Sequence, residues 1–169
     1  KSIWGDVKLA IGPAIDNGFY YDIDMEQSIK PEDFGKIEDK MREIICNNED
    51  FVRFELSKEE ALEKFKDNPY KVELINELPD GELITMYRTG DDFYDLCRGP
   101  HLPSTGKIKA FKLITITGAY WKGKSDNKML TRIYGTAFEN KTALEDHLKR
   151  LEEAKQRDHN KLGRDLEFF

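Results

Sequence analysis

Apolar and polar positions alternate in several short segments of the chain, and this alternation predicts β-strands. Residues 7–13 and 19–25 predict two strands joined by a tight turn, because Asp16-Asn17-Gly18 supplies residues that tolerate a positive φ. Residues 51–56 alternate like a half-buried strand. Further strand-like segments fill the second half of the chain, at residues 83–88, 93–97, 108–117, 119–123 and 129–138.

Other segments repeat their apolar residues at steps of three and four, which predicts helices. Pro31 opens the first helix, which ends near residue 48. Ser57 and Glu60 form a capping box at the start of a short helix, and Pro69 starts another. The apolar positions of the first helix are Phe34, Ile37, Met41, Ile44 and Ile45.

The strands of the second half are connected by short turns, so the sequence predicts an α+β fold with a mostly antiparallel sheet packed against helices. A long terminal helix should run from Lys141 to about Arg164, with dense charge around one leucine stripe. We expect residues 1–138 to form one domain and 139–169 to form a linker helix, because its apolar end needs a further domain to pack against. The stripe consists of Leu144, Leu148, Leu151 and Leu162.

The composition indicates a soluble cytosolic protein. Charged residues make up 36 % of the 169 positions, and the mean hydropathy is -0.70. No apolar run approaches the roughly 20 residues of a membrane span, and the first residues lack the pattern of a signal peptide. The two cysteines, Cys46 and Cys97, are expected to stay reduced.

The net charge of -6 argues against a nucleic-acid partner, but the charge is unevenly distributed. Residues 107–132 contain seven Lys or Arg and the single acid Asp126, interleaved with aromatic residues. Such a segment can bind a phosphate backbone, and it can equally be a solvated strand face with ordinary lysines. The basic residues are Lys107, Lys109, Lys112, Lys122, Lys124, Lys128 and Arg132, and the aromatic ones are Phe111, Tyr120 and Trp121.

The stretch "YDLCRGPHLPSTG", residues 94–106, sets Cys97 and His101 four residues apart on a turn that Gly-Pro enforces. A thiol and an imidazole can ligate a metal, but two ligands do not make a zinc site, and the other histidines lie on the terminal helix, where we expect them to be exposed. A nucleophilic Cys–His pair needs a neighbour that stabilises the thiolate, and the carboxylate of Asp95 has the wrong charge. Two interpretations remain: a buried cysteine beside a turn histidine, or a functional site whose other residues come from elsewhere in the protein.

Five segments, taken in order, resemble bacterial threonyl-tRNA synthetases: "IGPAIDNGFYYD", "PYKVELI", "YDLCRGPHLPSTGKIKAFKL", "GAYWKGKSDNKMLTRIYGTAF" and "LEEAKQRDHNKLGRDLEFF". The similar part is the amino-terminal editing region, whose domain is similar to one in alanyl-tRNA synthetases and free-standing editing proteins. The helix leading to the class II catalytic core follows it. The resemblance implies a truncated chain, with the class II core absent.

The resemblance implies a proofreading function in threonyl-tRNA aminoacylation. Serine lacks one methyl group of threonine, and a methyl supplies only about 1–3 kcal/mol of discrimination, so a second site would hydrolyse seryl-tRNA made in error. The implied partners are the threonine-specific tRNA and the rest of a synthetase expected to be a homodimer. No cofactor is expected for this region, whereas ATP and zinc are implied for the class II core. A non-catalytic tRNA-binding spacer and a metal-dependent aminoacyl-tRNA hydrolase remain alternatives.

The resemblance also implies the site residues. Lys71 would stabilise the oxyanion or contact the ribose, His101 with Cys97 would position or deprotonate water, and Asp95 with Tyr21 would hold the ammonium and hydroxyl of the substrate. The family adds a His-x-x-x-His pair on a helix preceding "IGP", and we expect the chain to begin after that helix. The residues implied for the tRNA acceptor end are Tyr120, Trp121, Lys122, Lys124, Asn127, Lys128 and Arg132.

Overall fold

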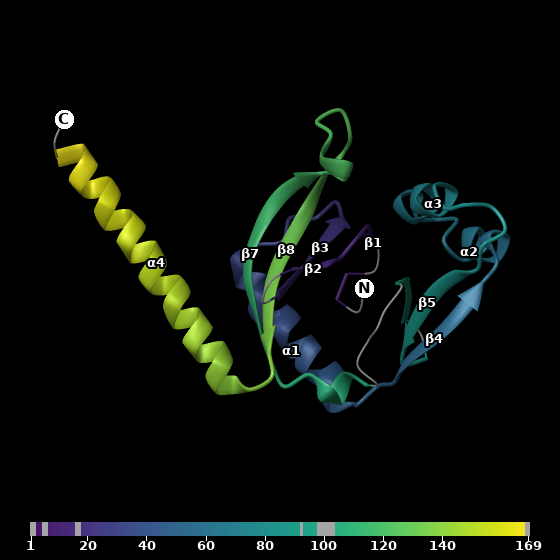
Figure 1. Cartoon of the computed structure of the whole chain (residues 1–169), viewed down its shortest axis with the longest axis horizontal. Coiled ribbons are helices and arrows are strands. Elements are labelled where there is room, and N and C mark those ends of the chain that lie inside the picture. Colours follow the sequence, from purple (N-terminus) through teal and green to yellow (C-terminus); the bar gives the residue numbers. More distant parts are fainter. Residues whose placement is uncertain (1–2, 5–6, 16–17, 92, 98–103, 168–169) are drawn as a thin grey trace.

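The computed structural model describes residues 3–4, 7–15, 18–91, 93–97 and 104–167, with 162–167 as helical backbone only. It contains two antiparallel sheets, each with its own helices, and a long helix that projects away from them (Figure 1). The α+β class and the antiparallel strands are therefore as predicted. The strands form two separate sheets, and the space between these sheets holds the candidate site.

The larger sheet has the strand order β1-β3-β8-β7, with β2 also paired to β3. Backbone hydrogen bonds join residues 8–15 to β3 along most of their length, and the pattern is interrupted around Gly12-Pro13. Proline is tolerated there because this is an edge strand. The strands are β1 (Lys8–Leu9), β2 (Ala14–Ile15), β3 (Gly18–Asp24), β7 (Ala110–Tyr120) and β8 (Met129–Phe138).

Helix α1 (Phe34–Cys46) packs on the larger sheet and follows a 3-10 turn at Pro31–Asp33. Its apolar residues Ile37 and Met41 contact a core around Leu113 and Ile133. The helix ends where predicted, and Asn48 then takes a positive φ of 50° that turns the chain toward the smaller sheet.

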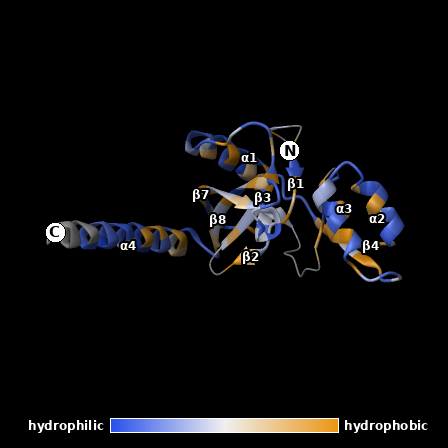
Figure 2. Ribbon diagram, turned by 90° about the horizontal axis from the view of Figure 1, so that it is seen from above, coloured by the Kyte–Doolittle hydropathy of each residue, from blue (hydrophilic) through white to orange (hydrophobic). Residues whose placement is uncertain are grey.

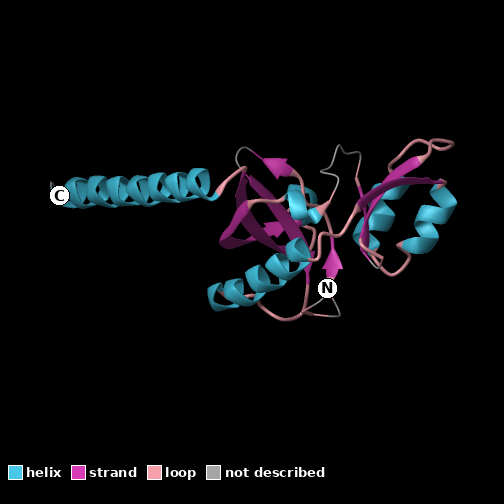
Figure 3. Ribbon diagram, turned by 90° about the horizontal axis from the view of Figure 1, so that it is seen from below, coloured by secondary structure: helices cyan, strands magenta, loops and turns pink. Residues whose placement is uncertain are grey.

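The smaller sheet has the order β4-β5-β6 and packs against two short helices (Figure 3). Its core centres on Ala61, Phe65, Ile75, Ile84 and Met86. The Ser57 hydroxyl caps the first helix by accepting from the Glu60 amide at 3.3 Å, as the sequence predicted. The elements are β4 (Phe51–Leu56), α2 (Lys58–Lys64), α3 (Pro69–Asn76), β5 (Ile84–Thr89) and β6 (Phe93–Leu96).

The last helix, α4 (Lys141–Glu167), touches the larger sheet only near its start. Leu144 is 8 % exposed there, and the His147 ring lies 4.9 Å from the Phe138 ring, so His147 is half-buried rather than exposed as expected. Apolar residues gather on these first turns, while residues 152–161 are all exposed (Figure 2). No helix among the described residues is long and apolar enough to cross a membrane.

One strand prediction was wrong. Residues 108–117 and 119–123 were expected as separate strands, but β7 runs unbroken from Ala110 to Tyr120, and Trp121–Gly123 is a 3-10 turn. A bulge between Leu113 and Thr115 shifts the register and allows pairing with β8 to continue to Tyr120. The predicted turn at residues 16–17 lies outside the described residues.

Candidate active site and nucleic-acid surface

Lys71 lies in the first turn of α3 and is 3 % exposed. Asn68 caps this helix, because its side-chain oxygen accepts from the backbone amides of Tyr70 and Lys71 at 3.1 and 3.3 Å. Pro69 occupies the first helical position, where its missing N–H costs nothing. The sequence thus places a buried ammonium at a rigid helix start.

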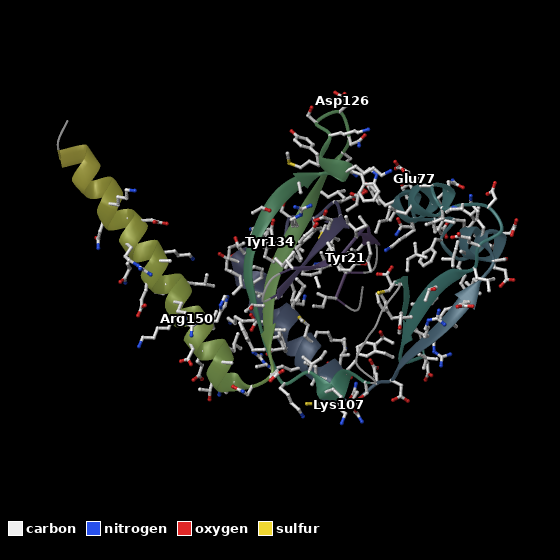
Figure 4. The ribbon with its side chains drawn as sticks, viewed as in Figure 1. Tyr21, Glu77, Lys107, Asp126, Tyr134 and Arg150 are labelled. Carbon is white, nitrogen blue, oxygen red and sulfur yellow. The ribbon has the colours of Figure 1, made fainter. Side chains whose placement is uncertain are left out.

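The partner of Lys71 is Asp95 in the edge strand β6, with 2.5 Å between the lysine Nζ and the aspartate Oδ1. The Leu96 amide donates to the same oxygen at 2.8 Å, and the Tyr21 hydroxyl donates to Oδ2. Tyr21 comes from β3 in the larger sheet (Figure 4). Its hydrogen bond to the Asp95 carboxylate therefore joins the two sheets. The Asp95 side chain is 20 % exposed, which leaves one approach for a ligand.

Tyr21 is held as a hydrogen-bond donor. Burial, followed by the negative charge of Asp95, raises the pKa of its phenol well above the ordinary value, so the hydroxyl stays protonated at physiological pH. Gly12 makes room for the ring, since a Cβ at this position would lie 2.0 Å from Cδ2 of Tyr21. The "IGP" motif therefore seats Tyr21 beside the edge strand of the larger sheet.

Cys97 follows β6 directly and is half-buried, and its amide donates to the Thr85 carbonyl at 3.3 Å. Cys97 lies two residues after Asp95, and it adds to the raised pKa of Tyr21, after burial and Asp95. His101 lies outside the described residues. The segment resumes at Ser104, which bridges to Asp50, and the Thr105 hydroxyl donates to the Ile44 carbonyl at 2.8 Å.

A cavity of about 640 Å³ opens beside this cluster, between the two sheets. This volume lies within the range of small-molecule and cofactor pockets. Lys71, Asp95 and Asn68 line it together with Phe93 and Tyr94, and the Lys64 ammonium stands 4.4 Å from the Tyr94 ring centre. Charged groups of both signs face the space, which suits a zwitterionic or polar ligand better than an apolar one.

A metal-ligand cluster is not seen in the described part of the chain, where no three His, Cys, Asp or Glu side chains gather closely enough to hold an ion. The residues placed together here are an ammonium, a carboxylate, a phenol and a cysteine. Such a set can bind an amino group, donate to a developing oxyanion and orient water.

The residues proposed for tRNA contact fall into two groups. Three of them are already engaged within the protein. Trp121 is 4 % exposed and packs edge-on against Tyr70, which removes it as a surface for base stacking. The ammonium of Lys122 binds Glu73 and Glu77, and Arg132 binds the buried Asp22 through two hydrogen bonds of 2.7 and 2.9 Å.

The second group faces outward. Tyr120 is 40 % exposed, Lys124 is exposed, and the Lys128 side chain is 63 % exposed although its ammonium lies 2.7 Å from Asp24. The Asn127 amide is used within the loop, where it donates to the Trp121 carbonyl at 2.8 Å. Tyr120, Lys124 and Lys128 are therefore the part of the predicted surface that is open to a nucleic acid.

Sequence reasoning missed Glu73, Tyr70 and Asn68 as residues that build the site. Tyr70 donates to Asp24 at 2.7 Å, and Asn68 donates to the Leu9 carbonyl at 2.8 Å, so both tie α3 to the larger sheet. Asn68 before Pro69 is a recognisable helix cap. No sequence signal marks Glu73 or Tyr70, since their partners are at least 46 residues away.

Comparison with known proteins agrees with the resemblance. Residues 84–134 match the family model described as "Threonyl and Alanyl tRNA synthetase second additional domain". The whole chain is 57 % identical over 171 residues to a threonine–tRNA ligase of Geobacillus sp. (strain WCH70), 59 % to one of Clostridium tetani and 56 %, over 169 residues, to one of Staphylococcus epidermidis. The resemblance to threonyl-tRNA synthetases is confirmed. The chain spans 26–27 % of the length of these relatives.

The residues of the candidate site lie partly inside the family-model match and wholly inside the alignments to the threonine–tRNA ligases. The family-model match includes Asp95, Cys97 and His101 as well as β7 and the first half of β8. Tyr21 and Lys71 lie outside that match but inside the alignments to the threonine–tRNA ligases, which cover 100 % of the chain. The residues that meet at Asp95 therefore come both from the matched segment and from outside it.

Proposed function

We propose that this chain is the editing region of a threonine–tRNA ligase and that it hydrolyses seryl-tRNA made in error. The observation that carries the proposal is the buried cluster of Lys71, Asp95 and Tyr21 beside a cavity of about 640 Å³, in a chain similar along its whole length to such ligases. The substrate would be the ester that joins serine to the terminal ribose of the threonine-specific tRNA.

The reaction is hydrolysis of that ester. A water oxygen attacks the carbonyl carbon, the bond to the ribose oxygen breaks, and the products are serine and a free ribose hydroxyl. The water gives up one proton to a base, for which His101 with Cys97 is the proposed group, and the leaving ribose oxygen takes up one proton. Lys71 would stabilise the charge that develops on the carbonyl oxygen or on the leaving ribose oxygen.

Asp95 and Tyr21 would recognise the amino acid. In the unliganded protein Asp95 accepts from Lys71, Tyr21 and the Leu96 amide, so it is oriented before substrate arrives. The substrate ammonium can add to this carboxylate from the open side. Tyr21, kept protonated, can share its hydroxyl with the serine hydroxyl, and a threonine methyl would meet a wall held in place by the Gly12 contact.

The tRNA acceptor end would contact the tip of the β7–β8 hairpin. Lys124 and Lys128 are exposed near the cavity, Lys128 lines it, and Tyr120 offers a ring for stacking. Because each phosphate contact releases counterions, affinity for tRNA should fall between 50 and 200 mM salt, to roughly a tenth for two contacts. A flat salt response would remove this part of the proposal.

A second function is a non-catalytic module that binds tRNA and spaces the domains of the ligase. The observation that favours it is the saturation of Asp95 by three donors, which also suits a purely structural joint between two sheets. We further propose that residues 139–169 act as the linker to the class II core, and that the ATP, zinc and dimer contacts of the ligase belong there.

The deciding experiment is deacylation of seryl- and threonyl-tRNA by this chain and by a version extended upstream to include the helix that the resemblance implies. We expect selective loss of serine from at least the extended protein, and a fall of 100-fold or more on Lys71→Met. Lys66→Met is the matched control, because Lys66 is an exposed lysine on the same unit that pairs with the exposed Glu63. If seryl-tRNA keeps its serine in the presence of either protein, the editing function is wrong and the non-catalytic binding module is the remaining function.

A further inference from the structure

Helix α3 is attached to both halves of the molecule. Ile75 belongs to the core of the smaller unit, whereas Tyr70 and Leu74 pack into a separate cluster with Ala10, Trp121 and Leu130 of the larger sheet. Lys71 lies between these two attachments, one turn before Ile75. The position of its ammonium relative to Asp95 therefore depends on how α3 is held against the larger sheet.

On the side of the larger sheet, α3 also contacts the hairpin tip, which is residues 121–128 and joins β7 to β8. The Trp121 Nε1 donates to Glu73 Oε2 at 2.8 Å, and the Lys122 Nζ lies 2.9 Å from Glu73 Oε1. The same ammonium binds Glu77, one helical turn further on (Figure 4). Both oxygens of Glu73 are thus occupied by neighbouring residues of the tip.

The backbone of the tip is shaped for this contact. Lys122 has a φ of 57°, in the left-handed region that residues other than glycine seldom adopt, and Gly123 follows at 70°. The Trp121 carbonyl accepts from Asn127, and the Trp121 amide donates to the Lys128 carbonyl at 3.0 Å, which closes the loop behind the turn. A strained conformation persists only where its surroundings hold it, and here the surroundings include two carboxylates of α3.

We propose that Glu73 is a positioning residue, which clamps α3 to the hairpin tip through Trp121 and Lys122 and so holds Lys71 against Asp95. Glu73 itself is about half exposed and does not line the cavity, so its effect passes through the helix rather than through contact with a ligand. The expected effect on catalysis rests on the proposed editing function, whereas the expected effect on Lys71 does not.

The clamp links the RNA surface to the site. Lys124 and Lys128 project from the same tip that holds Glu73, so a nucleic acid bound there contacts a segment fastened to the helix of Lys71. Removing the clamp should therefore disturb Lys71 without removing the exposed lysines. Binding of tRNA would then persist while the chemistry slows.

The test is chemical labelling of lysines with an acetylating ester, followed by mass spectrometry of the intact chain's peptides. Buried and paired, Lys71 should react slowly in the unaltered protein, with exposed Lys66 as an internal reference. We expect Glu73→Ala to raise the Lys71 rate at least fivefold relative to Lys66, and Glu73→Gln to raise it less, because glutamine can still accept from Trp121. Glu59→Ala, which removes an exposed glutamate in the first turn of α2 and leaves the Lys66–Glu63 pair intact, should leave the ratio unchanged.

A second pair of variants keeps the proposal testable if the Glu73 variants do not fold. Lys122→Met should expose Lys71 as Glu73→Ala does, and Lys122→Arg, which keeps a cation, should restore protection. General unfolding is tested by amide hydrogen exchange in β5, which should stay slow in every variant. An unchanged Lys71 rate in both Glu73→Ala and Lys122→Met overturns the proposal.

The kinetic arm separates this inference from the editing function. If the unaltered protein deacylates seryl-tRNA, Glu73→Ala should lower kcat tenfold or more and change KM less than twofold, since the RNA contacts remain. A raised KM with an unchanged kcat overturns the positioning role. If neither this chain nor the version extended upstream deacylates seryl-tRNA while Lys71 labelling still responds to Glu73, the editing function fails and the clamp stands.

Discussion

The two ion-pair clusters on α3 use the same chemistry in opposite surroundings. Lys71 and Asp95 are 4 % and 20 % exposed in their side chains, whereas Lys122 and Glu73 are 26 % and 48 % exposed. Both clusters connect the larger sheet or its hairpin to the smaller unit. Removing one partner of a buried pair leaves an unsolvated charge, but water replaces the partner of an exposed one. The buried cluster should therefore dominate stability, while the exposed one mainly sets geometry.

The largest effect should come from Asp95→Asn. This change leaves the buried Lys71 ammonium without its counter-charge, and we expect the free energy of unfolding to fall by about 3–5 kcal/mol in urea titrations. Lys71→Met should cost less, about 1–3 kcal/mol, because Asp95 keeps Tyr21, the Leu96 amide and partial access to water.

The double variant completes the test of the buried pair. If the two groups act as a pair, Lys71→Met should recover part of the stability lost in Asp95→Asn, since the unpaired ammonium is then gone. Strict additivity of the two losses would show that the contact contributes nothing specific, and the contrast with the exposed cluster would disappear.

Gly12→Ala should have the next largest effect on stability, because it displaces Tyr21 within the buried cluster. The added methyl would lie 2.0 Å from the tyrosine ring, so the ring must move away from Asp95, and overpacking of this kind costs about 1–3 kcal/mol. Gly35→Ala is the matched control, since Gly35 lies in α1 with no atom within 4 Å of a new Cβ, and it should be neutral or stabilising by up to about 1 kcal/mol. Equal stabilities of the two variants would contradict the account.

Tyr70→Phe should have a smaller, pH-dependent effect at the joint between α3 and the larger sheet. Burial opposes ionisation of Asp24, but hydrogen bonds from Lys128 and Tyr70 outweigh it and lower the pKa of this carboxyl. A lowered folded-state pKa adds stability that is complete above the unfolded value of about 3.9 and is lost as the pH falls through the folded value.

The measurement follows from that sign. At pH 7, Tyr70→Phe should lower the free energy of unfolding by about 0.5–1.5 kcal/mol, the ordinary contribution of one hydrogen bond. The difference from the unaltered protein should shrink as the pH falls below about 4, because Asp24 then becomes protonated in both. A difference that grows on acidification would mean that Tyr70 does not act through Asp24.

The sequence was sufficient for most elements of the fold. Local signals identified α1, the capped helix after Ser57 and the strands β4, β5 and β6, because periodicity, proline and capping residues act within a few positions. The division of the strands between two sheets was not predictable, since it depends on pairing between segments as distant as Tyr21 and Ile133. The bulge near Leu113, which keeps β7 continuous, also has no local sequence signal.

The candidate site was predictable only through resemblance. Spacing alone brought Asp95, Cys97 and His101 together, and nothing local connects them to Lys71 or Tyr21, which are 24 and 74 positions from Asp95. The basic segment was harder to interpret, because Trp121 is buried and the charged groups of Lys122 and Arg132 pair with carboxylates within the protein. Their partners Glu73 and Asp22 lie in distant segments, so charge counted along the sequence could not separate them from Lys124.

The smallest effect on stability should come from Lys122→Met in the exposed cluster. Exposed ion pairs contribute little to stability, and hydrogen bonding by Trp121 to Glu73 survives the change, so we expect only a small loss at low salt. Screening should erase even this difference near 1 M salt, where the Debye length is about 3 Å. Lys66→Met should give a similarly small change, because its pair with Glu63 is even more exposed. What should separate the two variants is Lys71, whose protection from labelling Lys122→Met reduces and Lys66→Met does not. If Lys122→Met lowered the free energy of unfolding as much as Asp95→Asn does, the exposed cluster would not differ from the buried one.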